Sequence, residues 1–223
     1  MATIAENLQA VSARINEART RAGRASEVTL LAVSKGHGIA RIEQALAAGQ
    51  NAFGENYVQD ALEKIDALPQ LEWHLIGPLQ SNKTRLAAER FDWVQTVDRE
   101  KIARRLSDQR PAHRPPLNVL IQVNISGEQT KGGVAPHEVR ELARKVAALP
   151  RLRLRGLMAI PAPGTHADLQ KMKKLYDELR PEFGMDTLSM GMSDDLEAAI
   201  AVGSTMVRVG TAIFGQRAQA RAA

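Results

Sequence analysis

The sequence of 223 residues contains no cysteine. This absence excludes disulfide bonds, thiolate nucleophiles and cysteine-ligated metals, and it fits a reducing compartment. No apolar run approaches the roughly 20 residues that a membrane-spanning helix needs. The first residues also lack the basic and apolar segments of a secretory signal. We therefore expect a cytoplasmic protein with no membrane partner.

Aromatic side chains are scarce as well, at 4% of the chain. The net charge of +5 suggests an anionic partner, either a nucleic acid or a phosphorylated small molecule. Nucleic-acid binding usually relies on aromatic stacking or on a clustered basic helix, whereas the arginines here are scattered. A nucleic-acid partner is therefore not expected, and a nucleic-acid-binding module is the less favoured alternative.

Several common functional motifs are missing from the sequence. It has no G-x-G-x-x-G after the first apolar run, no G-x-x-x-x-G-K-[ST] and no G-x-S-x-G. The usual dinucleotide and nucleoside-triphosphate loops and the hydrolase nucleophile elbow are thus absent. The five histidines form no i, i+4 pair, so no metal site is predicted.

What the sequence does contain is a regular alternation of short apolar runs and amphipathic segments. Strands are expected at residues 28–34, 52–54, 72–76, 93–97, 117–124, 154–160, 187–190 and 206–209. Helices are expected at residues 39–48, 57–67, 82–89, 99–107, 137–148, 167–179 and 194–201. An earlier helix follows a capping-box pattern formed by Thr3 and Glu6.

This alternation predicts an α/β fold, a single (β/α)8 TIM-type barrel with an extra N-terminal helix. No linker or shift in composition divides the chain, so residues 1–223 are taken as one domain with a basic tail from about residue 217. A doubly wound open sheet is the structural competitor, because the same alternation would serve it.

Candidate functional residues lie where the strands of such a barrel would end. Lys35 closes the first strand, and Ser193, Gly210 and Thr211 follow the seventh and eighth strands, whose loops often bind phosphate. A desolvated lysine has a lowered pKa, and its free amine attacks aldehydes. A phosphorylated aldehyde such as pyridoxal 5′-phosphate (PLP) would suit this set. In the alternative interpretation, Ser193 only caps the next helix and Gly210 only permits a turn.

The ordered blocks "AVSK", "FGENYVQ", "WHLIGPLQSNK", "VNISGEQTKGG", "GLMAI", "LSMGMSDD" and "GSTMVRVGTAIFG" resemble the pyridoxal phosphate homeostasis proteins. That family is related in fold to the barrel domain of alanine racemase, fold type III among PLP-binding proteins. The resemblance runs from Leu30 to Gly215.

The resemblance implies a set of PLP-binding residues. Lys35 would hold the cofactor covalently as an aldimine, and Arg208 would face the pyridine nitrogen. The phosphate would be bound at Ser193, Gly210 and Thr211, and Asn56 and His74 would line the cofactor pocket. Two alternatives stay open: Asn56 could cap the following helix, and His74 could be a hydrogen-bonded core residue.

Other residues near the expected site are interpreted more plainly. Lys131 could be a second lysine near the mouth, although a solvated loop lysine is the favoured interpretation. Met158 and Met190 are expected to be packing residues. The sequence departs from the family where Gly36, His37 and Gly38 follow Lys35, which predicts a more flexible loop.

The predicted arginine partner also bears on function. A guanidinium only donates hydrogen bonds, so the pyridine nitrogen would stay unprotonated and the ring would be a weak electron sink. The two tyrosines, Tyr57 and Tyr176, both lie in expected helices, and no second acid/base is evident. The expected role is intracellular PLP homeostasis by storage, buffering or delivery to PLP-dependent apoenzymes, by a monomer or weak homodimer. The alternative is a racemase-like enzyme acting on amino acids.

Overall fold

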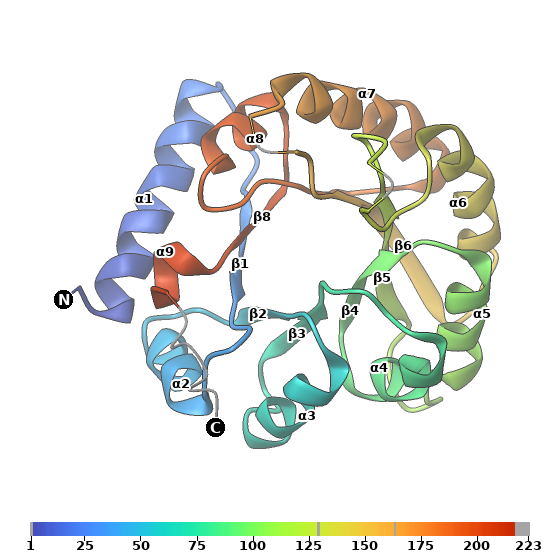
Figure 1. Ribbon diagram of the computed structural model, residues 1–223, viewed down its shortest axis with the longest axis horizontal. Helices are drawn as coiled ribbons and strands as arrows, with labels where there is room; N and C mark the ends of the chain where they lie inside the picture. Colours follow the sequence, from blue (N-terminus) through green and yellow to red (C-terminus); the bar gives the residue numbers. More distant parts are fainter. Residues whose placement is uncertain (1, 129, 163, 217–223) are drawn as a thin grey trace.

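In the computed structural model, which describes residues 2–128, 130–162 and 164–216, eight parallel strands close into a barrel (Figure 1). The strands are β1 (Thr29–Val33), β2 (Ala52–Glu55), β3 (Glu72–Leu75), β4 (Trp93–Val97), β5 (Leu117–Val123), β6 (Leu152–Ala159), β7 (Thr187–Ser189) and β8 (Met206–Val209). Each strand pairs with the next one, and β8 pairs with β1, where Leu31 lies opposite Arg208. This closure confirms the predicted barrel and excludes the open sheet.

Helices surround the barrel on its outside, as Figure 1 shows. They are α1 (Ile4–Arg21), α2 (Ile39–Ala47), α3 (Val58–Ala67), α4 (Thr84–Arg90), α5 (Glu100–Gln109), α6 (Val139–Ala147), α7 (His166–Phe183), α8 (Leu196–Val202) and α9 (Thr211–Phe214), with 3₁₀ turns η1 (Ser81–Lys83) and η2 (Pro136–Glu138). The short helix α9 was not predicted. Helix α7 runs past the predicted end at residue 179 and contains Pro181, although a proline usually ends a helix.

Alternate residues along each strand divide between two environments. One set packs against the helices in the main core, for example Ala32, Val207 and Val209. The other set points into the barrel and forms two smaller apolar groups, which are Leu31, Val33, Ile76 and Met206, and Trp93, Leu120 and Met158. Side chains on both faces of the strands are therefore buried, as expected when helices cover a parallel sheet.

The extra N-terminal helix α1 packs against the side of the barrel formed by α8 and α9. The predicted capping box is present, since Thr3 and Glu6 bond each other's backbone N–H groups. An apolar stripe that includes Leu8 and Val11 is buried, and Asn7 Nδ2 donates to Ile213 O at 2.9 Å. Helix α1 thus supports α9, next to α8 and β1 in Figure 1.

Two sequence-based expectations concern the rest of the chain. The predicted basic tail from about residue 217 lies outside the residues that the structure describes. Among the helices that are described, none is long and apolar enough to cross a membrane.

Candidate functional site

One cavity of about 340 Å³ opens at the carboxyl ends of β1, β2 and β8. This volume falls in the range of roughly 300–1,000 Å³ that is usual for small-molecule sites. Its lining is Val33, Lys35, Asn56, Ile76, Ile160, Met192, Ser193, Asp194, Arg208, Gly210 and Thr211. We call it the Lys35 cavity. It brings together every predicted cofactor residue except His74.

Lys35 lies two residues beyond the end of β1, in a tight turn. Gly36 has φ of 76°, a conformation that other residues rarely adopt. The His37 N–H donates to Ser34 O at 3.0 Å and closes the turn. The imidazole of His37 is buried and stacks on Phe214 of α9, with ring centroids 5.0 Å apart. The sequence predicted a more flexible loop here, but the structure shows His37 anchoring the loop to α9.

A buried ion pair lies directly behind this turn. Lys64 Nζ donates to Glu55 Oε1 at 2.7 Å and to Ser34 O at 3.1 Å, and Ser34 Oγ donates to the same carboxylate oxygen at 2.6 Å. Burial raises the pKa of the Glu55 carboxyl, and the charge of Lys64 opposes that rise. The cluster fixes the residues that precede Lys35 and Asn56, so it positions two walls of the cavity.

Sequence analysis missed this cluster, although a pattern could have revealed it. Lys64 lies on the same helical face as Val58, Ala61 and Ile65, all of which are buried. A lysine within an apolar stripe must find a buried partner. Glu55, in the same "GENYVQ" block as Asn56, was the available carboxylate.

Asn56 reaches the cavity because the chain after β3 approaches it closely. A Cβ at Gly77 would lie 2.1 Å from Asn56 O, so only glycine fits there. Tyr57, and not Asn56, is the N-cap residue of α3. The alternative in which Asn56 caps that helix is therefore wrong.

Ser193, Gly210 and Thr211 form the side of the cavity where phosphate binding was predicted. Ser193 was also expected to cap a helix from residue 194, and this is wrong, because α8 begins at Leu196 with Asp195 as its N-cap residue. The Asp195 carboxylate accepts a hydrogen bond from the Met192 N–H at 2.6 Å, and the helix begins only after Asp195. Ser193 therefore stays in the loop and faces the cavity.

Helix α1 holds this loop in place through one arginine. Arg14 Nη2 donates to Ser193 O at 2.9 Å, and Arg14 Nε pairs with Glu197 Oε1 at 2.7 Å. The first N–H groups of α9, at Thr211 and Ala212, have no acceptor within that helix. Hydroxyl and backbone N–H donors thus meet at one end of the cavity, beside the exposed carboxylate of Asp194.

Arg208 occupies the floor of the cavity and is almost fully buried. Its Nη1 donates to Ser189 Oγ at 2.7 Å and its Nη2 donates to Ala159 O at 2.8 Å. Burial lowers the pKa of Arg208 to about 10, so the guanidinium remains charged at neutral pH. It offers the cavity only hydrogen-bond donors.

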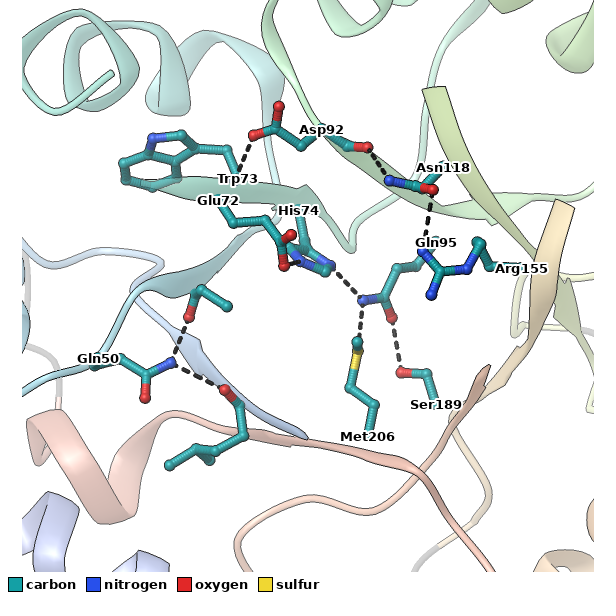
Figure 2. Close-up of polar contacts among 12 residues, drawn as sticks. Gln50, Glu72, Trp73, His74, Asp92, Gln95, Asn118, Arg155, Ser189 and Met206 are labelled. Carbon is teal, nitrogen blue, oxygen red and sulfur yellow. Dashed lines mark hydrogen bonds and ion pairs between the residues drawn. The ribbon is translucent and has the colours of Figure 1, made fainter. Parts of the chain in front are cut away.

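His74 is not brought to the cavity. Its ring is fully buried and stacks on Trp93, with ring centroids 5.0 Å apart. Figure 2 shows its contacts with Glu72 and Gln95. Inward-facing side chains alternate along a strand, and Ile76 occupies the layer that reaches the cavity. His74 therefore lies one layer deeper, as in the alternative interpretation of a hydrogen-bonded core residue.

The remaining residues singled out in the sequence lie away from the Lys35 cavity. Lys131 lines a neighbouring cavity of about 210 Å³ and pairs with Glu128 at 2.9 Å. Met158 and Met190 are fully buried packing residues. Tyr57 is 63% exposed, while the buried Tyr176 lies on α7.

The chemistry of the lining suits a flat, phosphorylated aldehyde. Lys35 supplies an amine, the side chains of Ile76 and Ile160 supply apolar walls, and Arg208 supplies a buried donor for an acceptor atom. No cluster of three or more metal-ligating side chains occurs in the part of the chain that the structure describes.

Comparison with known proteins decides the family. The alanine racemase N-terminal domain family matches residues 7–218. The pyridoxal phosphate homeostasis protein of Escherichia coli K12 is 57% identical over 229 residues, covering 97% of this chain and 98% of the relative. The chain belongs to the pyridoxal phosphate homeostasis protein family.

Solved structures agree with this family assignment. The structure of PipY of Synechococcus elongatus PCC7942 without PLP matches this chain with 38% sequence identity and a TM-score of 0.85. The match covers 96% of this chain and 100% of PipY. The structure of PipY with PLP bound gives 36% identity and a TM-score of 0.81, with the same coverage. Alanine racemase from Corynebacterium glutamicum, at 18% identity and a TM-score of 0.70, covers 96% of this chain and 60% of the racemase, and it shares the fold.

Proposed function

We propose that this protein binds PLP in the Lys35 cavity and serves PLP homeostasis, by storing, buffering or delivering the cofactor. One observation carries the proposal: Lys35, Asn56, Ser193, Arg208, Gly210 and Thr211 line a single cavity. PipY, which is similar over its whole length, has been solved with PLP bound, and this supports the assignment.

Each end of the cavity suits one part of the cofactor. The Lys35 amine would add to the aldehyde carbon and form an imine with loss of water. Arg208 would donate to the ring nitrogen, and the hydroxyls of Ser193 and Thr211 together with backbone N–H groups would bind the phosphate. Ile76 and Ile160 would contact the ring. PLP itself supplies the reactive aldehyde and the conjugated ring.

A carrier role is favoured over efficient turnover of amino acids. Arg208 is a fixed donor, so the ring nitrogen would remain unprotonated and the ring a weak electron sink. Lys35 and Asp194 are the other ionisable groups in the lining, and neither tyrosine is part of it. Apart from the exposed Asp194, this lining supplies no second acid/base of the kind that two-base racemisation needs.

The first test is to trap the cofactor on the protein. Wild type, Lys35→Ala and the surface variant Lys101→Ala are incubated with PLP, reduced with borohydride and mapped by peptide mass spectrometry. We expect the reduced label on Lys35 in wild type and in Lys101→Ala, and its loss in Lys35→Ala. Label spread over surface lysines in all three proteins would refute the site.

A second test separates the carrier from an enzyme. The loaded protein is incubated with L-amino acids, and the D-enantiomers are measured by chiral chromatography. In parallel, activity is followed when the loaded protein is added to a PLP-dependent apoenzyme. Recovery of apoenzyme activity without D-amino acid formation supports delivery, whereas sustained D-amino acid formation supports the racemase-like alternative. The proposal retains the predicted cytoplasmic location. It also retains the predicted monomer or weak homodimer, and sedimentation of the loaded protein tests that oligomeric state.

A further inference from the structure

A continuous chain of buried polar side chains leads from Arg208 through the barrel interior. Arg208 Nη1 lies 2.7 Å from Ser189 Oγ, and Ser189 Oγ lies 2.7 Å from Gln95 Oε1. Gln95 Nε2 lies 2.9 Å from His74 Nδ1, and His74 Nε2 lies 2.8 Å from Glu72 Oε1. Figure 2 shows the part of this chain from Ser189 to Glu72. We call these five residues the interior polar chain.

The hydrogen bonds of the interior polar chain all run in one direction, from the donor Arg208 at one end to the acceptor Glu72 at the other. A guanidinium can only donate, so Ser189 Oγ must accept from it. The single hydroxyl proton of Ser189 is then available for Gln95, whose carbonyl oxygen Oε1 lies 2.7 Å away and accepts it.

The same reasoning continues to the far end of the chain. Because the Gln95 carbonyl faces Ser189, its amide N–H groups face His74 Nδ1 and, at 3.2 Å, Met206 Sδ. His74 Nδ1 must therefore accept, which places the ring proton on Nε2. That proton is donated to the half-exposed carboxylate of Glu72. Turning the Gln95 amide over would leave the buried Ser189 hydroxyl proton without this acceptor.

Burial and charge agree with this order. Gln95, Ser189 and His74 are fully buried, so each needs its hydrogen bonds satisfied within the protein. Burial lowers the pKa of His74, and the hydrogen bond from His74 lowers the pKa of Glu72. A neutral imidazole between a carboxylate and an amide is the state that the chain requires.

We propose that the interior polar chain fixes the orientation of the Arg208 guanidinium, and that Ser189 and Gln95 are thereby positioning residues for a ligand's ring nitrogen. This inference rests on the proposed function. Two bonds, to Ser189 Oγ and Ala159 O, hold two of the five guanidinium N–H groups, and Arg208 lines the cavity. If one of these bonds were removed, the Arg208 guanidinium would adopt more than one orientation. Its hydrogen bond to the ring nitrogen of a ligand would then weaken.

The test compares two ligands that differ in a single ring atom. PLP carries the acceptor nitrogen, and 1-deazapyridoxal 5′-phosphate carries a C–H group in its place. Dissociation constants of both are measured by equilibrium titration of wild type, Ser189→Ala and Gln95→Leu. A folding defect affects both ligands equally, so the ratio of the two constants reports on the contact with Arg208.

Ser204→Ala is the matched control. Ser204 is a fully buried serine that lies outside both the cavity and the interior polar chain, and its hydroxyl lies within hydrogen-bond distance of the carbonyls of Leu188, Met190 and Met206. Wild type and Ser204→Ala are expected to favour PLP by roughly tenfold or more, since a hydrogen bond to a charged group is involved. In Ser189→Ala and Gln95→Leu we expect this preference to fall to about threefold or less, because the guanidinium is no longer fixed.

The outcomes separate the two proposals. An unchanged or larger preference for PLP in both Ser189→Ala and Gln95→Leu would overturn the inference while leaving PLP binding intact. An equal loss of preference in Ser204→Ala would also overturn it, because the effect would then be general. Failure of wild type to bind either aldehyde would refute the proposed function, and this inference with it.

Discussion

Replacing Lys64 with methionine should destabilise the protein strongly, because the substitution leaves a carboxylate buried without its cation. The side chains of Lys64 and Glu55 are only 9% and 1% exposed. Methionine keeps much of the apolar length of lysine and removes the ammonium that bonds Glu55 and Ser34 O.

The expected loss is about 3–5 kcal/mol of unfolding free energy, the usual cost of removing one partner of a buried ion pair. Such a loss is a large share of the roughly 5–15 kcal/mol available to a protein domain. The double variant Lys64→Met, Glu55→Leu removes both charges and should recover much of the loss. An exposed pair such as Arg21 with Glu17, at 74% and 64% exposure, is worth at most about 0.5 kcal/mol.

Urea unfolding followed by the fluorescence of Trp73 and Trp93 measures these quantities. Wild type, both single variants, the double variant and Arg21→Ala are compared at pH 7. Burial raises the pKa of Glu55 in the folded protein. The folded state of Lys64→Met therefore binds a proton more readily than the unfolded chain does, so its stability should rise as the pH falls toward 5.

Two results would refute this reasoning. A loss below about 1 kcal/mol in Lys64→Met would show that the pair contributes little beyond a surface pair. Additive effects in the double variant would show that the two side chains do not depend on each other.

Three further predictions follow from the same structure. The pKa of His74 is lowered by burial, so the unfolded chain takes up a proton first as the pH falls below about 6.5, and stability should fall by up to about 1.4 kcal/mol per pH unit. Urea titrations between pH 5.5 and 7.5 should show this slope, on the order of one proton, in wild type and not in His74→Phe. Removing the stack on Phe214 in His37→Ala should free the Lys35 turn and weaken PLP binding by roughly threefold to tenfold, whereas His37→Phe should retain the affinity. Equal affinities in equilibrium titration would contradict that role. A methyl group at Gly77 would meet Asn56 O at 2.1 Å, so Gly77→Ala should cost about 1–3 kcal/mol and lower PLP affinity, as measured by urea unfolding and titration.

The barrel itself was predictable because apolar residues recur with different periods in its strands and in its helices. Residues 93–97 and 206–209 were placed without error, since short apolar runs flanked by polar segments admit few other structures. The start of α8 was not placed correctly, because Ser193 and Asp195 are both good N-cap residues, and the bond from the Met192 N–H to the Asp195 carboxylate was not foreseen. Arg14, which is 179 residues away in sequence, also bonds the Ser193 carbonyl oxygen, and no local pattern shows that contact.

The cavity residues that follow the ends of strands were predictable from barrel topology, whereas Arg208, which lies within β8, came only from the family resemblance. Lys35, Asn56 and Gly210 follow the last residues of β1, β2 and β8, and barrel topology alone brings such positions to one mouth. His74 was assigned to the same mouth although it lies inside β3. Counting by twos from Ile76 would have placed it one layer below.

The depth of His74 changes what its chemistry can accomplish. At the mouth, an imidazole would contact a ligand directly and titrate in solvent. In the barrel interior it is held in one tautomer by Gln95 and Glu72, and it can influence a ligand only through Ser189 and Arg208. A buried polar chain is costly unless every donor meets an acceptor, and here each donor from Arg208 to His74 faces an acceptor of the next residue. Under the proposed function, the interior polar chain is therefore part of the binding site, although Arg208 alone among its five members lines the cavity.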